Sequence, residues 1–142
     1  MKRSSTAIWY GTGKTGSGKI TSQSKAVDSA NYAWNTRFEE AKGTNPEELL
    51  AAAHAACFTM KLSFVINEAR FTADEIETTT TVTLEKSGIT ESHLSVKAKV
   101  PGISKEKFEE CAEKAKNECP VSRALSIKIT MDALLLLPAV VD

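Results

Sequence analysis

The chain has 142 residues, of which 42% are hydrophobic and 25% charged, and its 18 basic residues balance its 18 acidic ones. This size and composition predict a single folded domain, residues 1–142, and exclude a disordered chain. Without a net positive charge, neither nucleic acid nor an anionic membrane surface is an expected partner. The odd number of cysteines and the lack of a signal-like apolar run near the first residues predict a cytoplasmic protein with reduced thiols.

Two strands and a long helix are predicted in the first half. Residues 6–10 are aromatic and β-branched, residues 11–18 form a glycine-rich turn, and residues 19–24 have polar strand character. Asn45 is suited to the N-cap of a helix, Pro46 to its first position, and Glu48 to a capping box. A helix is therefore predicted to begin here.

Residues 49–66 of this helix are apolar on nearly every side, as in a central buried helix. The internal His54 and Lys61, together with the alanine content, argue against a membrane span. Because one small domain offers too little cover for such a helix, we expect an obligate dimer.

The second half predicts a hairpin, a helix and a final strand. Apolar and polar residues alternate along residues 76–85 and again along 93–100, which favours two antiparallel strands with one solvated face. Ser104 can cap a second helix whose apolar stripe includes Cys111 and ends at Cys119, and residues 127–131 alternate as a last strand. The order β–β–α–β–β–α–β indicates an α+β fold of antiparallel sheet with two helices.

The sequence contains the beginnings of two cofactor motifs, and neither is complete. Residues 13–19 nearly spell a phosphate-binding loop, but Ile20 stands where a hydroxyl should hold Mg²⁺, and strand-like sequence follows instead of a helix. The cysteines and histidines contain no C-x-x-C pair and no zinc-ligand spacing. We therefore expect neither a metal nor another cofactor.

Cys57 is the first candidate for chemistry. Its apolar setting favours an inert core thiol, unless a cation such as Arg37 stabilises the thiolate. His54 precedes Cys57 by three residues, so the two share a helix face, and either a Cys–His nucleophile pair or a packed histidine is consistent with this spacing. Cys119 is open to the same two interpretations, core or redox.

Residues 35–39 and 43–58 closely resemble the central signature of the OsmC (osmotically inducible protein C) family, whose relatives include the organic hydroperoxide resistance proteins. Residues 100–116 and 119–122 resemble the family's second cysteine region. The resemblance implies the OsmC-like fold, an intertwined homodimer with active sites at the subunit interface, and reduction of organic hydroperoxides, and more weakly of hydrogen peroxide, in oxidative and osmotic stress defence. An external dithiol would supply the electrons.

The resemblance also implies roles for single residues: Cys57 as the peroxidatic thiol, Cys119 as the resolving thiol, Arg37 as the activator of the thiolate, and Glu47 as the acid that holds the arginine. An apolar pocket would favour organic hydroperoxides, and Phe38, Phe58 and Met60 are its candidate substrate-binding residues, although residues of these types lie more often in the core. Cys111 departs from the two-cysteine pattern, and its stripe position favours a small core residue. Two other functions stay open, a non-enzymatic stress-related ligand-binding protein and an acyl hydrolase that uses Cys57 and His54.

Overall fold

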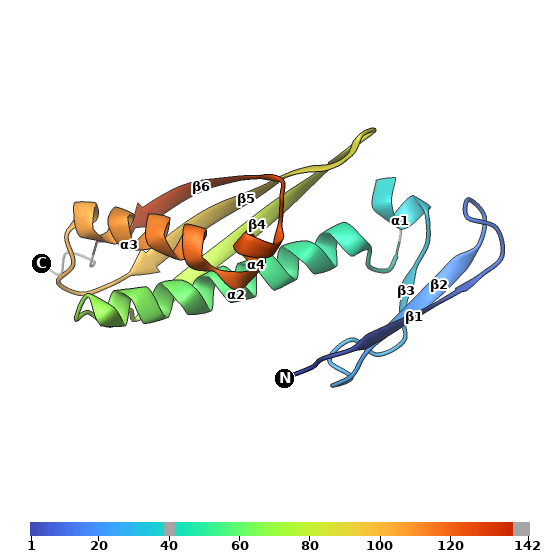
Figure 1. Ribbon diagram of the computed structural model, residues 1–142, viewed down its shortest axis with the longest axis horizontal. Coiled ribbons are helices and arrows are strands. Elements are labelled where there is room, and N and C mark those ends of the chain that lie inside the picture. The colour runs from blue at the N-terminus through green and yellow to red at the C-terminus, as the bar shows by residue number, and fades with distance from the viewer. Residues whose placement is uncertain (39–41, 138–142) are drawn as a thin grey trace, which may run out of the picture. The chain divides into compact units, whose positions relative to one another are not determined.

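A computed structural model describes residues 1–38 and 42–137 of the chain. The chain divides into two compact units, Met1–Leu49 and Leu50–Asp142, with the boundary inside one long helix (Figure 1). Each unit is described by itself, and the single-domain organisation stays a prediction.

The first unit contains a three-stranded antiparallel sheet of β1 (Ser5–Tyr10), β2 (Ser17–Ser22) and β3 (Ala30–Tyr32), in chain order. Gly18 lies opposite Trp9 in the β1–β2 register, and the Trp9 and Tyr32 rings are 5.3 Å apart. A Cβ atom at Gly18 would lie 2.5 Å from both the Ile8 carbonyl oxygen and the Tyr32 ring, so only glycine fits here. The run that resembled a phosphate loop is therefore the turn of a hairpin.

A single asparagine connects the short helix α1 (Asn35–Phe38) to the start of α2 (Pro46–Glu68). Asn45 Oδ1 accepts a hydrogen bond of 2.8 Å from the Glu48 backbone N–H, which confirms Asn45 as the N-cap. Its Nδ2 donates to the Thr36 carbonyl oxygen, also at 2.8 Å. The Glu48 carboxylate accepts from the Thr44 hydroxyl at 2.7 Å, where the predicted capping box would have it accept from Asn45 N–H.

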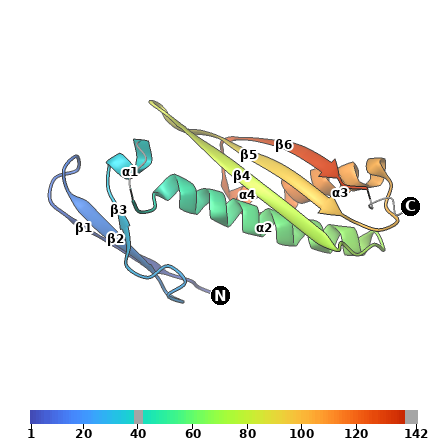
Figure 2. The same cartoon turned by 180° about the vertical axis from the view of Figure 1, so that it is seen from behind.

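The second unit contains β4 (Glu75–Glu85), β5 (Gly88–Lys99) and β6 (Lys128–Leu135), in that order. The β4–β5 hairpin is antiparallel as predicted, but β6 runs parallel to β5, which corrects the expectation of purely antiparallel sheet. The reason is the connection: α3 (Lys105–Glu118) and α4 (Pro120–Ala124) carry the chain back along the sheet before β6 begins. Figures 1 and 2 show that α2 and α3 both cover the same face of this sheet.

The core of the second unit is built from one stripe of each helix and alternate residues of β5. The α3 stripe is buried as predicted, and the Ser104 side chain caps α3 by accepting from the Lys107 N–H. On α2, residues three or four apart turn toward the sheet. The fully buried members of these stripes are His54, Phe58, Leu62, Ile66, Phe108, Ala112, Ala115 and Cys119.

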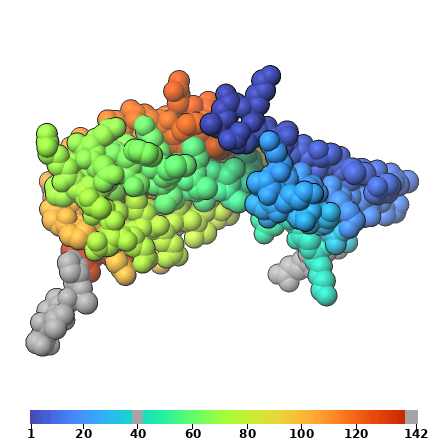
Figure 3. Space-filling view, turned by 90° about the horizontal axis from the view of Figure 1, so that it is seen from below, coloured from blue at the N-terminus to red at the C-terminus, as the bar shows by residue number. Residues whose placement is uncertain are grey.

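The opposite face of α2 is exposed, as the green atoms in Figure 3 show. Met60 and Phe64 are each 60% exposed. A groove of about 770 Å³ runs between this face and the residues around the start of β4, lined by Ala56, Met60, Ser63 and Ile76 among others. The predicted central helix is thus buried on one side only. Within the described residues, α2 is the one helix long and apolar enough to cross a membrane, judged by length and composition alone.

Candidate active site

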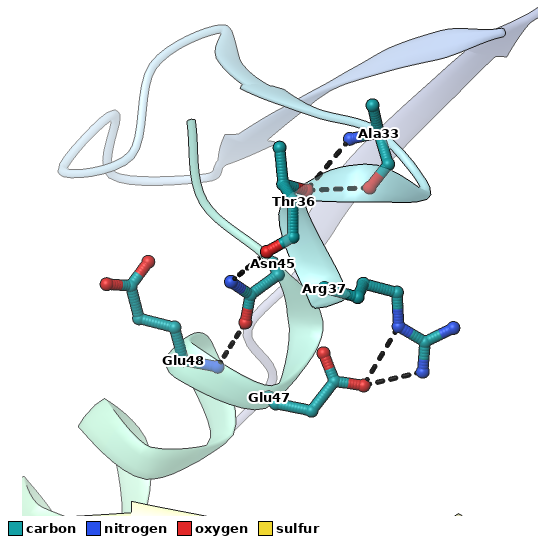
Figure 4. Close-up of polar contacts among 6 residues, drawn as sticks. All are labelled: Ala33, Thr36, Arg37, Asn45, Glu47 and Glu48. Atoms are coloured by element: carbon teal, nitrogen blue, oxygen red, sulfur yellow. Dashed lines mark hydrogen bonds and ion pairs between the residues drawn. The ribbon is translucent and has the colours of Figure 1, made fainter. Parts of the chain in front are cut away.

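Arg37 lies on α1 and Glu47 lies in the first turn of α2, and their side chains form an ion pair in the first unit (Figure 4). Both Nε and one terminal nitrogen of Arg37 donate to the same oxygen, Glu47 Oε1, at 3.0 and 2.5 Å. The pair is placed by Asn45, which caps α2 two residues before Glu47 and holds α1 one residue before Arg37. The predicted contact between this acid and this arginine is therefore present.

The environment of the pair keeps the arginine charged and holds the carboxylate in place. Hydrogen bonding to Glu47 raises the pKa of Arg37 further above its usual range, while burial opposes this shift. The Arg37 side chain is 36% exposed and the Glu47 side chain 10%. Glu47 Oε2 is buried, and no hydrogen bond to it comes from the described residues.

The two predicted redox thiols meet in the second unit. Cys57 lies on α2 and is half-buried, whereas Cys119 lies between α3 and α4 and is fully buried. The Cys119 thiol and the backbone N–H of Val121, in the first turn of α4, both lie close enough to the Cys57 sulfur to shift the pKa of its thiol. Both cysteines are in the thiol form. The structure thus pairs Arg37 with Glu47 in one unit and Cys57 with Cys119 in the other.

The surroundings of Cys57 in the second unit favour the neutral thiol. Burial raises the pKa of Cys57 above its ordinary value. The Val121 N–H opposes this shift because it stabilises the thiolate, and the Cys119 thiol adds to it. Since the thiolate is the nucleophile, a further positive charge is needed to activate Cys57 near neutral pH.

His54 is not available as a base for Cys57. Its Nδ1 lies 2.7 Å from the Ser92 hydroxyl on β5, and its Nε2 lies 2.8 Å from the Ser122 hydroxyl on α4. Burial lowers the pKa of His54, which favours the neutral ring. Of the two interpretations of His54, the packed histidine is confirmed. The acyl-hydrolase hypothesis therefore has no general base for Cys57.

The stability of the protein should depend on the protonation of His54. Its pKa is lowered from the ordinary 6.5, so below that pH the unfolded chain binds a proton that the folded chain rejects. The free energy of unfolding should therefore fall as the pH drops from about 7.5 to about 5.5. Urea unfolding at both pH values measures this, and His54→Gln should show a smaller difference. An equal pH dependence in the two proteins would contradict the assignment.

The three predicted substrate-binding residues differ in their surroundings in the described structure. Phe58 is 0% exposed and belongs to the core, the second of the two places open to it, because it follows Cys57 directly on α2 and turns toward the sheet. Met60 follows Cys57 by three residues, is exposed, and lines the groove. The side chain of Phe38 lies outside the described part of the structure.

Cys111 is 3% exposed and lies in the core cluster, as the stripe of the second helix predicts. Burial raises its pKa, so it stays a thiol at neutral pH. Among the described residues, no group of three or more histidine, cysteine or acidic side chains is placed to hold a metal ion.

Sequence reasoning missed two groups near the thiols, the Ser122 hydroxyl and the Val121 N–H, and one on β5, the Ser92 hydroxyl, which binds His54. Ser92 did carry a signal, because it shares the buried face of β5 with Leu94 and Val96, where a polar residue needs a partner. The other two groups depend on how α4 turns after Pro120, and no local pattern encodes that turn.

Two free thiols close to each other on an α+β scaffold are the arrangement expected of a dithiol redox protein. Residues 39–132 match the family model described as OsmC-like protein. Peroxiredoxin OsmC from Escherichia coli is 46% identical over 130 residues, which cover 89% of this chain and 91% of that protein. The chain therefore belongs to the OsmC-like family.

Further relatives agree with this membership. Organic hydroperoxide resistance protein-like 1 from Staphylococcus saprophyticus is 34% identical over 119 residues, 81% of this chain and 84% of that protein. The crystal structure of the organic hydroperoxide resistance protein OhrB of Bacillus subtilis has a TM-score of 0.64 at 27% identity, covering 94% of this chain and 98% of that one. The OsmC like protein from Mycoplasma pneumoniae, with a TM-score of 0.76 at 18% identity over 96% and 99% of the two chains, supports the fold alone.

Proposed function

We propose that this chain is a cysteine-based peroxidase that reduces organic hydroperoxides to alcohols. The observation that carries the proposal is the proximity of the half-buried thiol of Cys57 to the buried thiol of Cys119. The names of the relatives, peroxiredoxin OsmC and organic hydroperoxide resistance proteins, agree with this chemistry.

Each thiol has one role in a balanced reaction. The Cys57 thiolate attacks one peroxide oxygen, the O–O bond breaks, and the leaving alkoxide takes a proton to become the alcohol. Cys57 is now a sulfenic acid. The Cys119 thiol attacks the Cys57 sulfur, water leaves, and a disulfide forms. An external dithiol then reduces this disulfide and restores both thiols.

Arg37 activates Cys57 in this proposal, and Glu47 holds Arg37. A guanidinium beside the thiolate lowers the thiol pKa and stabilises the charge that develops on the leaving oxygen. Glu47 precedes Cys57 by ten residues on α2, about 15 Å along the helix axis, so the acid acts through the arginine and not on the thiol. The ion pair between Arg37 and Glu47 supports this arrangement.

An apolar binding surface would favour organic hydroperoxides over hydrogen peroxide, because burying an alkyl or aryl tail contributes free energy. Met60 is the candidate contact for such a tail, since it is exposed three residues after Cys57. We further propose that the protein works in the cytoplasm, where free thiols such as its three cysteines persist.

The protein is also proposed to be a homodimer that covers the exposed face of α2. Phe64 is 60% exposed and leaves large apolar surface in the open on this face, which a second copy can cover.

The dimer is tested by sedimentation of the wild-type chain and two variants. Wild type should sediment at twice its chain mass of 15.4 kDa. Phe64→Glu places a charge on the exposed apolar face of α2 and should shift the protein to the monomer. The control, Lys105→Glu, changes charge at a side chain that is 80% exposed on α3 and should leave the dimer intact. A wild-type protein that sediments as a 15.4 kDa monomer would contradict the proposal.

The activity is tested by following the consumption of cumene hydroperoxide and of hydrogen peroxide with a dithiol reductant. Turnover with preference for the organic substrate is the expected result. If the reduced, folded protein consumes neither, the peroxidase proposal is wrong, and the non-enzymatic ligand-binding function takes its place.

A further inference from the structure

His54 connects three elements of the second unit through a buried imidazole. The residue is 0% exposed on α2, and its two ring nitrogens bind the Ser92 hydroxyl of β5 and the Ser122 hydroxyl of α4. A hydroxyl can donate or accept, so a neutral ring is satisfied on both sides in either tautomer. Neither the redox chemistry nor the hydrophobic core requires a histidine at this position.

The two serine contacts of His54 hold different elements: Ser122 belongs to α4, and Ser92 belongs to β5. Ser122 follows Cys119 by three residues, and His54 precedes Cys57 by three residues, which is nearly one helical turn. The His54–Ser122 contact therefore lies next to the place where Cys119 and the Val121 N–H meet Cys57. Ser92 lies on β5 and is distant in sequence from both cysteines.

The segment that contains Ser122 is held by Cys119, which is buried in the core, by Val121, which packs against the core, and by few polar side-chain contacts. The chain breaks from α3 at Cys119, Pro120 begins α4, and α4 has only five residues. A helix this short is not stable without tertiary contacts. Among the described residues, and apart from the groups that meet at Cys57, no side-chain hydrogen bond other than His54–Ser122 ties α4 to α2.

We infer that His54 is a positioning residue: through Ser122 it fixes the segment 119–122 against α2, and so sets where the Cys119 thiol and the Val121 N–H meet Cys57. The Val121 N–H stabilises the Cys57 thiolate, and the Cys119 thiol must reach the Cys57 sulfur to close the disulfide. A shift of α4 would weaken both the stabilisation of the Cys57 thiolate and the approach of the Cys119 thiol to Cys57. This inference rests on the proposed roles of Cys57 and Cys119, but its test needs no peroxide.

The test compares Ser122→Ala with Ser92→Ala. Each variant removes one buried hydroxyl from the same imidazole, so both leave a ring nitrogen unsatisfied and both should lose stability to a similar extent. Two readouts are measured on the full-length reduced protein. The first is the pH midpoint of Cys57 alkylation by iodoacetamide, read by peptide mass spectrometry. The second is the rate at which diamide, which takes two electrons and two protons from a thiol pair, forms the Cys57–Cys119 disulfide.

Ser122→Ala should raise the alkylation midpoint and slow disulfide formation by about tenfold or more, since displacing a reacting group by about 1 Å can cost up to about 100-fold. Ser92→Ala should leave both readouts near wild type, and Ser122→Thr, which keeps the hydroxyl, should restore them. If Ser122→Ala does not fold, His54→Gln is the second variant and should change both readouts in the same direction. Equal changes in the two alanine variants, or no change in either, would overturn the inference.

The experiments distinguish a failure of the proposed peroxidase activity from a failure of this inference. A protein that forms the Cys57–Cys119 disulfide with diamide at a rate that depends on Ser122, yet consumes no hydroperoxide, would keep the positioning role of His54 and reject the proposed activity.

Discussion

Cys57→Ser is expected to abolish hydroperoxide reduction, with a loss of at least about a thousandfold, on the scale seen when other enzymes lose their nucleophile. A hydroxyl at this position does not ionise near neutral pH and cannot be oxidised to the sulfenic acid that the second thiol attacks. The measurement is the steady-state consumption of cumene hydroperoxide with a dithiol reductant.

Two further cysteine variants serve as controls. Cys111→Ser should retain activity, because Cys111 precedes Cys119 by eight residues along α3, about 12 Å of helix rise. Cys119→Ser should react with about one equivalent of hydroperoxide and leave Cys57 as a sulfenic acid that dimedone traps. A Cys57→Ser protein that still turns over, or a Cys111→Ser protein that folds but does not, would place the nucleophile elsewhere.

Arg37→Met should lower the catalytic rate by about 10² to 10³-fold, the cost of removing one preorganised charge from a developing anion. The second unit by itself raises the pKa of Cys57 through burial, so the thiolate depends on an added positive charge. Without Arg37 the thiolate fraction should rise only at higher pH. The pH profile of the variant should therefore shift to higher pH, and its deficit should shrink as the pH rises.

Glu47→Gln and Arg70→Met separate this effect from a general loss of arginine or charge. Glu47→Gln keeps a hydrogen-bond acceptor for Arg37 and should cost less than Arg37→Met. Arg70→Met alters an exposed arginine after α2 and should leave rate and pH profile unchanged. An Arg37→Met protein with the wild-type pH profile would show that the guanidinium does not act on the thiol.

The fold was predictable where a local signal decides it. Asn45 and Ser104 cap the two long helices as expected, and the alternation along β4 and β5 gives their buried faces. The parallel pairing of β6 was not predictable, because it depends on how far α3 and α4 carry the chain back along the sheet. A strand's own residues do not specify the direction of its neighbour.

The candidate site was predictable in its residue types and less so in its contacts. The pairing of Arg37 with Glu47 follows from the family resemblance, and the structure has it. The place of Phe58 could not be taken from the resemblance, since one step along a helix turns a side chain by about 100° and moves it from the site to the core. The partners of His54 come from β5 and α4, 38 and 68 residues away, and no sequence period connects such positions.

The most direct test of the account is the disulfide itself. Reduced wild-type protein is treated with one equivalent of cumene hydroperoxide, digested without reductant, and its cross-linked peptides are identified by mass spectrometry. We expect Cys57 and Cys119 to become linked within each chain while Cys111 stays a free thiol. A protein that keeps all three thiols, or that links Cys111 to either of the other two, would contradict it.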